Sequence, residues 1–170
     1  TIGPSDFGGT LPQAFSAHPK RDPRTGDLHT MTYWWGWGNQ VQYTVVDTAG
    51  KVVTKRMVET TGSPMLHDMS LTERYAVVYD LPVVFDLDAA MAGVRMPYFW
   101  QDDYPARVGL IDRTDVDGAV RWLDVDPCYV FHPMNAFDDG DDVVLDVVRW
   151  DGMFRKGHQG PFESGQHSSL

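Results

Sequence analysis

Short segments rich in Val, Thr, Tyr and Trp alternate with turn-forming clusters along most of the chain. Gly or Asp-Gly stands at many of the breaks, as in DTAGK at 47–51 and DDGDD at 138–142, and supplies the backbone angles of tight hairpins. β-Branched and aromatic residues favour a pleated, half-buried surface. The pattern predicts nine strands in an antiparallel meander, at residues 28–36, 40–47, 51–58, 65–71, 74–80, 107–113, 119–125, 128–136 and 142–149.

Helical character is confined to one short stretch, FDLDAAMAG at 85–93, where Asp86 or Asp88 can cap the first turn. The chain is therefore predicted to be all-β, in a sandwich, a barrel or several propeller blades. Residues 155–170 lack periodic apolar positions, and we expect a loop or disordered tail there. We treat residues 1–170 as a single unit.

Composition narrows the possible partners. With 170 residues, 42% of them hydrophobic, the chain is long enough to bury a core. The net charge of −10 and the absence of clustered Lys and Arg argue against nucleic-acid binding. Cys128 is the one cysteine, and no apolar run approaches about 18 residues. We therefore expect a cytoplasmic protein, with peripheral contact to a membrane left open.

Three of the six histidines share a local context. His18, His67 and His132 lie in SAHPK, MLHDM and VFHPM, each at or within a predicted strand and close to a polar turn. A proline follows two of them, disfavours helical angles for the histidine and pushes it toward an extended conformation. Proline also donates no ladder hydrogen bond, so these histidines are expected at a strand end or rim. Neutral imidazole suits zinc, copper, nickel or ferrous iron.

Other interpretations of these histidines stay open. A single histidine in an apolar strand is more often a core residue, and the His-Pro pairs of a non-catalytic binding or scaffold module would only shape turns. A zinc hydrolase with three histidine ligands is a third possibility. Asp68 follows His67 directly, and adjacent strand residues point to opposite faces, so its carboxylate is not expected on the same metal.

Four segments resemble, in order and spacing, motifs of the carotenoid cleavage oxygenase family, which includes apocarotenoid and stilbene dioxygenases and the retinoid isomerohydrolase. They span nearly all of residues 1–150. One departure is Asp138, which follows Phe137 where the family often has Glu; we expect Asn135 and Asp138 to organise the turn. The segments are SAHPKRDPRTGDL, MLHDMSLTERYAVVYDLPVVFD, ARVGLIDR and FHPMNAFDDGDDVVLD.

The resemblance implies a seven-bladed β-propeller with ferrous iron on its axis, held by four histidines. Three of these would be His18, His67 and His132, and the fourth ligand and the partner glutamates would lie outside the chain. The chain would then be a central fragment of about three to four blades. Such a fragment is expected to hold iron weakly, to accept zinc or nickel in its place, and to self-associate through its open sides.

For the complete protein, the resemblance implies oxidative cleavage of a conjugated C=C bond in a carotenoid or apocarotenoid, with O2 as co-substrate and aldehyde or ketone products. Cleavage of a stilbene, or isomerisation, is the alternative within the family. Residues 82–100 resemble segments that form a tunnel mouth at a membrane, and burial against another blade is the equal alternative. Tyr33, Trp35 and Trp37 are predicted to share one face of a strand, where packing explains them better than substrate contact.

Overall fold

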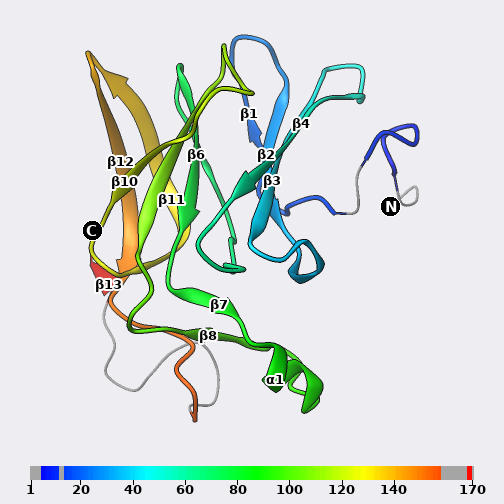
Figure 1. The fold of residues 1–170 in the computed structure, drawn as a ribbon. Helices are drawn as coiled ribbons and strands as arrows, with labels where there is room; N and C mark the ends of the chain where they lie inside the picture. Colours follow the sequence, from blue (N-terminus) through cyan, green and yellow to red (C-terminus); the bar gives the residue numbers. More distant parts are fainter. Residues whose placement is uncertain (1–4, 12–13, 158–167, 170) are drawn as a thin grey trace.

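The computed structural model describes residues 5–11, 14–157 and 168–169 (Figure 1). Within these residues, three antiparallel sheets stand side by side, and a two-stranded arm extends below them. The predicted all-β architecture of antiparallel sheets is confirmed. The described residues include no helix long and apolar enough to cross a membrane.

In each of the three sheets, the order of the strands in space follows their order along the chain. The first strand of each sheet therefore lies at one edge, and β11 lies against β5. The first sheet contains β1 (Lys20–Arg21), β2 (Leu28–Tyr33), β3 (Gln40–Val46) and β4 (Val52–Glu59); the second contains β5 (Ser70–Leu71), β6 (Tyr75–Asp80), β9 (Arg107–Asp112) and β10 (Arg121–Asp124); the third contains β11 (Tyr129–Asp139), β12 (Asp142–Trp150) and β13 (Ser168–Ser169).

The turn chemistry follows the sequence pattern, as the hairpin between β3 and β4 illustrates. The Asp47 amide donates to the Lys51 carbonyl at 2.9 Å, and the Asp47 carboxylate accepts from the Ala49 and Lys51 amides at 3.0 and 2.8 Å. Gly50 has φ 79°, a left-handed conformation that costs glycine little. The predicted DTAGK turn is therefore confirmed.

Three strand predictions were clearly too long, and the one at 119–125 is shortened to the four residues of β10. The strand predicted at 28–36 ends at Tyr33, because Trp35–Trp37 form a short 3-10 helix, η1, in which the Trp37 amide donates to the Trp34 carbonyl at 2.9 Å. The expected face shared by Tyr33, Trp35 and Trp37 does not exist, and Trp35 is exposed. The strand predicted at 65–71 is reduced to its last two residues, which form β5.

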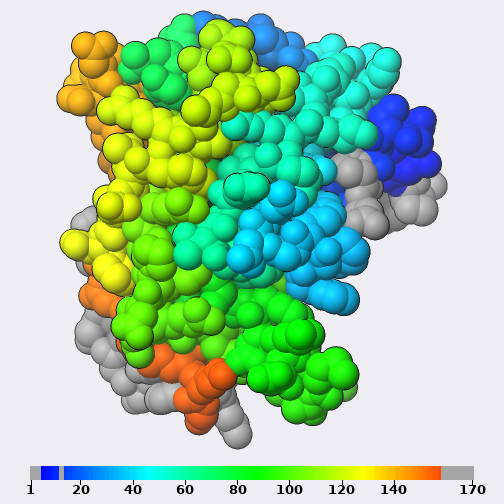
Figure 2. All heavy atoms as spheres, in the orientation of Figure 1, coloured from blue at the N-terminus to red at the C-terminus, as the bar shows by residue number. Residues whose placement is uncertain are grey.

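The arm was not predicted as strands. Its two strands, β7 (Val83–Phe85) and β8 (Tyr98–Trp100), pair antiparallel and carry the helix α1 (Leu87–Met91) between them. The predicted cap is confirmed, since the Asp86 carboxylate accepts from the Ala89 amide at 2.9 Å. Figure 2 shows the arm as a protrusion at the lower right of the molecule.

Only part of the predicted tail at 155–170 lies within the described residues. Residues 158–167 and 170 lie outside the described residues. Residues 155–157 have neither helix nor strand, whereas Ser168–Ser169 pair with the end of β12 as β13, which differs from the predicted loop. The expected single unit of three to four blades stays a prediction, as does self-association through the open sides.

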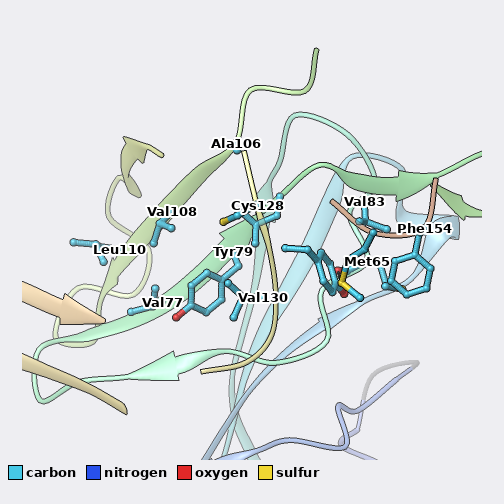
Figure 3. Close-up of a cluster of buried hydrophobic side chains, with 13 residues drawn as sticks. Met65, Val77, Tyr79, Val83, Ala106, Val108, Leu110, Cys128, Val130 and Phe154 are labelled. Carbon is cyan, nitrogen blue, oxygen red and sulfur yellow. Dashed lines mark hydrogen bonds between the residues drawn. The ribbon is translucent and has the colours of Figure 1, made fainter. Parts of the chain in front are cut away.

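The core consists of two layers, one on each face of the second sheet. Alternation along β6 directs Ala76 and Val78 toward the first sheet, where they pack with Met31, Tyr43 and other buried residues. The neighbouring β6 residues Val77 and Tyr79 face the third sheet; Figure 3 shows them with Val108, Cys128, Val130 and further members of that layer. The second sheet is thus covered on both faces.

Charged groups join the sheets where the chain turns. The guanidinium of Arg113, on the loop after β9, pairs with the buried carboxylate of Asp22, just after β1. Burial alone would raise the pKa of Asp22, but the Arg24 amide and Arg113 lower it to about 2. Asp138 of β11 accepts from the Arg74 amide and the Thr72 hydroxyl at 2.9 and 3.1 Å. Asn135 and Asp138 were expected to organise their own turn; instead both lie within β11, and Asp138 binds the turn between β5 and β6 of the second sheet.

His29 is buried in the first sheet, away from the other described histidines. Its Nδ1 lies 2.6 Å from the Tyr43 hydroxyl, and its Nε2 is buried without a partner in the described structure. Burial lowers its pKa to about 4, with a smaller contribution from the charge of Arg113. The ring is therefore neutral in the folded protein at pH values where it is charged in the unfolded chain.

This difference predicts a pH-dependent stability. Between pH 6.5 and 4 the unfolded state binds one more proton at His29 than the folded state, so stability falls as the pH falls through this window, by up to about 3 kcal/mol. Urea unfolding at several pH values measures the free energy of unfolding. Between pH 6.5 and 4 this free energy should change less steeply with pH in His29→Gln than in the parent chain. The lowered pKa of Asp22 changes the stability at lower pH, as the pH falls from about 3.8 toward 2, so Asp22 does not account for the change in this window. A slope unchanged by His29→Gln would contradict the assignment.

Candidate metal centre

The structure brings His18, His67 and His132 together. His18 lies two residues before β1, His67 lies three residues before β5, and His132 belongs to β11. Each of these strands is the first of its sheet, so the three sheets contribute one histidine each at the edge where their first strands meet. The other described histidine, His29, is not part of this group.

The two prolines act as the sequence suggested, by interrupting ladder pairing beside the ring. After Pro19 the chain enters β1 at Lys20. In β11 the register with β12 shifts on both sides of Pro133, between Val130 and Pro133 and again between Pro133 and Asn135. Because proline has no amide hydrogen to donate, His132 lies at an irregular point of its strand.

The ring nitrogens lie close to one another. The Nε2 of His67 is 3.0 Å from that of His18 and 3.1 Å from that of His132, and the three ligand atoms all lie within 4.8 Å of one another. An imidazole nitrogen carries either a hydrogen or a lone pair, so the His67 Nε2 cannot make a full hydrogen bond with both neighbours. A cation that accepts all three lone pairs resolves this conflict.

The spacing fits a divalent transition metal. Two nitrogens bound at about 2.1 Å to one ion lie about 3.0 Å apart at a right angle and about 3.4 Å apart at a tetrahedral angle. The two observed separations, 3.0 and 3.1 Å, match the right angle. Burial lowers the pKa of His67, and the positive charges that His18 and His132 would carry lower it further, which favours the neutral form that binds a metal.

An apolar wall borders the histidines on one side. Phe131 makes an edge-to-face contact with the ring of His67, with centroids 5.4 Å apart, and packs in the same way on Tyr129 at 4.8 Å. A cavity of about 470 Å³ is lined by His67, Phe131, His132, Val148 and Trp150. A molecule in this cavity would contact the apolar side chains of Phe131, Val148 and Trp150. It would also contact two of the three imidazoles.

Three residues that support the histidines were not predicted from the sequence. Tyr129 is buried and its hydroxyl donates to the Met65 carbonyl at 3.1 Å, which ties β11 to the segment that carries His67. Lys20 and Asp68 form an ion pair of 2.8 Å between the first two sheets. Asp68 is not among the residues whose ligand atoms converge, but His67 and Asp68 lie before β5 and not in a strand, so the expected strand alternation does not apply to them.

Antiparallel sheets whose first strands converge on a histidine cluster define a fold of the β-propeller type with a candidate metal centre where these strands meet. The chain belongs to the carotenoid cleavage oxygenase family: the family model described as "Retinal pigment epithelial membrane protein" matches residues 1–168. The family assignment made from the four motifs is therefore confirmed.

The relatives include a carotenoid cleavage oxygenase of Mycobacterium tuberculosis, 39% identical over 203 residues that cover 95% of this chain and 40% of the relative. The chain thus spans about 40% of that relative's length. Among solved structures, the lignostilbene dioxygenase of Pseudomonas brassicacearum matches with a TM-score of 0.79 and 30% identity over 94% of this chain and 35% of its own. Cobalt-substituted Synechocystis ACO matches with a TM-score of 0.78 and 25% identity, covering 96% and 36%.

The central position of His67 makes it the most sensitive of the three histidines. In the 170-residue chain, His67→Ala should weaken cobalt(II) binding by more than about 100-fold, because altering a residue that only supports a ligand already costs about 10- to 100-fold. Competition with a coloured chelator measures the affinity. His29→Gln is the control and should leave the affinity unchanged. Equal affinity for the His67→Ala and parent chains would contradict the metal centre.

Proposed function

We propose that this chain is part of a non-haem ferrous dioxygenase that cleaves a conjugated C=C bond of an apolar substrate into two carbonyl products. The observation that carries the proposal is the convergence of three Nε2 atoms from three sheets, two of the separations being 3.0 and 3.1 Å. Membership of the carotenoid cleavage oxygenase family supports it.

In this proposal His18, His67 and His132 hold the ion, with a further ligand from outside the chain. Imidazole nitrogen is a donor that suits ferrous iron. Three neutral ligands add no negative charge, so the ion keeps its full positive charge. Bound ferrous iron would supply the binding and activation of O2.

The remaining residues near the centre position the substrate and exclude water. Phe131, Val148 and Trp150 provide the apolar part of the cavity of about 470 Å³ beside His67 and His132. A conjugated chain or ring system fits such a wall through apolar and aromatic contact. In the overall reaction the C=C and O=O bonds break and two C=O bonds form, with one oxygen atom in each product. No side chain of this chain needs to take up a proton.

The apolar cavity and the family membership support a substrate class. We propose a carotenoid or apocarotenoid, with a stilbene as the alternative, since both offer a conjugated C=C bond between apolar ends. A scaffold in which the His-Pro pairs only shape turns is disfavoured, because it gives no reason for three imidazoles to converge from different sheets.

The function is tested in the longer protein that contains this chain, purified with ferrous iron. With apocarotenoid or hydroxystilbene substrates and labelled O2, mass spectrometry should find one labelled oxygen atom in each of the two carbonyl products. Label in one product alone would indicate a different reaction. Short reaction times and a control in labelled water correct for exchange between aldehydes and solvent.

We also propose that the tip of the arm contacts a membrane surface from which an apolar substrate is taken up. Leu87, Met91, Val94 and Met96 are exposed by 59%, 81%, 43% and 52% and lie within ten residues on and after α1. Such a group of exposed apolar side chains is typical of a lipid or protein contact.

The arm predicts a measurable lipid affinity. Replacing Leu87 and Met91 by Ser should reduce co-sedimentation with phosphatidylcholine vesicles several-fold, because both side chains lose apolar area that lipid would cover. The matched control is Val53→Ser, which alters a side chain that is 54% exposed on β4, away from the arm. Equal sedimentation of all three proteins would exclude this contact.

A further inference from the structure

The ion pair between Lys20 and Asp68 lies directly beside the candidate metal centre. The Nζ of Lys20 is 2.8 Å from Oδ2 of Asp68, and the two side chains are 30% and 3% exposed. The other oxygen of Asp68 accepts from the Met69 amide at 2.6 Å, so both carboxylate oxygens are engaged. The pair therefore has a fixed geometry on the aspartate side.

Each partner is connected to a histidine by very little chain. Asp68 is covalently adjacent to His67, and a single residue, Pro19, separates Lys20 from His18. The ring of Pro19 fixes its own φ angle and restricts the backbone of His18. A displacement of Lys20 or Asp68 therefore also displaces the neighbouring imidazole.

Few other contacts fix the spacing of these two segments. Within the described structure, no backbone hydrogen bond joins residues 16–21 to residues 66–71, since β1 pairs with β2 and β5 pairs with β6. The segment that carries His132 is tied differently, through the Tyr129 hydroxyl and the Met65 carbonyl. Among the described residues, the Lys20–Asp68 pair thus joins the segments of His18 and His67 in addition to the contact between the two imidazoles themselves.

We propose that Lys20 and Asp68 are positioning residues that hold the imidazoles of His18 and His67 at the separation a metal ion requires. The inference rests on the proposed metal centre and adds to it a function for two residues that contribute no ligand atom. A ligand pair at 3.0 Å leaves little tolerance, because a metal–nitrogen distance is fixed within about 0.2 Å.

The electrostatics of this pair favour a role in positioning the two histidines over a role in stabilising the fold. A buried ion pair stabilises a fold little, because removing both charges from water offsets much of their attraction. A pair in which one partner is almost fully buried nevertheless resists separation, since each charge would be left without a partner. A short ion pair between the two segments therefore opposes their separation, which is the property a spacer between two ligands needs.

The same two sheets offer two matched comparisons. Asp22 and Arg113 form a buried pair between them, with side chains 1% and 13% exposed, but neither residue is adjacent to a converging histidine. Arg24 and Glu73 form an exposed pair there, with side chains 59% and 68% exposed. Loss of the first pair should lower stability without a specific effect on the metal, and loss of the second should change little.

The experiment measures cobalt(II) affinity and the visible spectrum of the bound ion for the 170-residue chain. Asp68→Asn should lower the affinity by about 10- to 100-fold and shift the cobalt bands, because the ligand separation is no longer fixed. Lys20→Arg, which keeps the charge, should retain most of the affinity. Asp22→Asn should lower the melting temperature, with the affinity of the folded protein changed less than about threefold.

A double variant, K20M/D68L, protects the test against unfolding, because replacing a buried ion pair by apolar side chains of similar size is often neutral for stability. It should fold and still bind cobalt weakly. If Asp68→Asn or K20M/D68L folds and binds like the parent, or if Asp22→Asn weakens binding equally, the positioning role is wrong. A parent chain that binds no cobalt overturns the metal centre itself, and with it this role.

Discussion

The convergence of three imidazole nitrogens, all within 4.8 Å of one another, is the constraint on which the rest of this structure depends. The separations of 3.0 and 3.1 Å join atoms whose residues are 49 and 65 positions apart in the chain. No local element can hold such atoms together, so the stacking of three sheets must do so. The second sheet is packed on both faces, by Ala76 and Val78 on one side and Val77 and Tyr79 on the other, and this fixes its neighbours relative to it. The apolar core therefore sets the distance between the histidines as much as any polar contact does.

Much of this arrangement could be predicted because it depends on patterns of neighbouring residues in the sequence. Alternating β-branched residues and Asp-Gly turns predicted most strands of the three sheets to within a few residues, and the shared context of His18, His67 and His132 selected the three histidines that the fold brings together. The prolines beside two of them carried a physical meaning, since Pro133 interrupts the ladder of β11 at the histidine. His29 lacked that context, and the fold buries it against Tyr43 instead.

The features that were missed depend on contacts between distant segments. One exception is local: the tryptophans at 35 and 37 favour a strand, but a 3-10 turn forms there and Gly38 follows it with φ 64°. The segment 65–69 is apolar enough for a strand, but it forms a largely buried loop that leads into β5. Its Met65 carbonyl accepts a hydrogen bond from the Tyr129 hydroxyl and not from a neighbouring strand. The pairing of Lys20 with Asp68 joins residues 48 positions apart, and nothing in either local sequence indicates it. A single sequence contains no information on such pairs beyond their charge.

The position of Asp68 explains how a carboxylate can lie next to a histidine of the centre without becoming a ligand. The charge of Asp68 acts to raise the pKa of His67, yet burial and the two neighbouring histidines outweigh it, so the pKa is lowered overall. Its two oxygens are occupied by Lys20 and the Met69 amide, which neutralises the charge and keeps it from an ion. A metal ion held only by these neutral nitrogens would keep its full charge, although an acidic residue lies one position away. The ion pair can thus serve two purposes with the same contact, since the lysine that fixes the ligand spacing also removes the competing ligand.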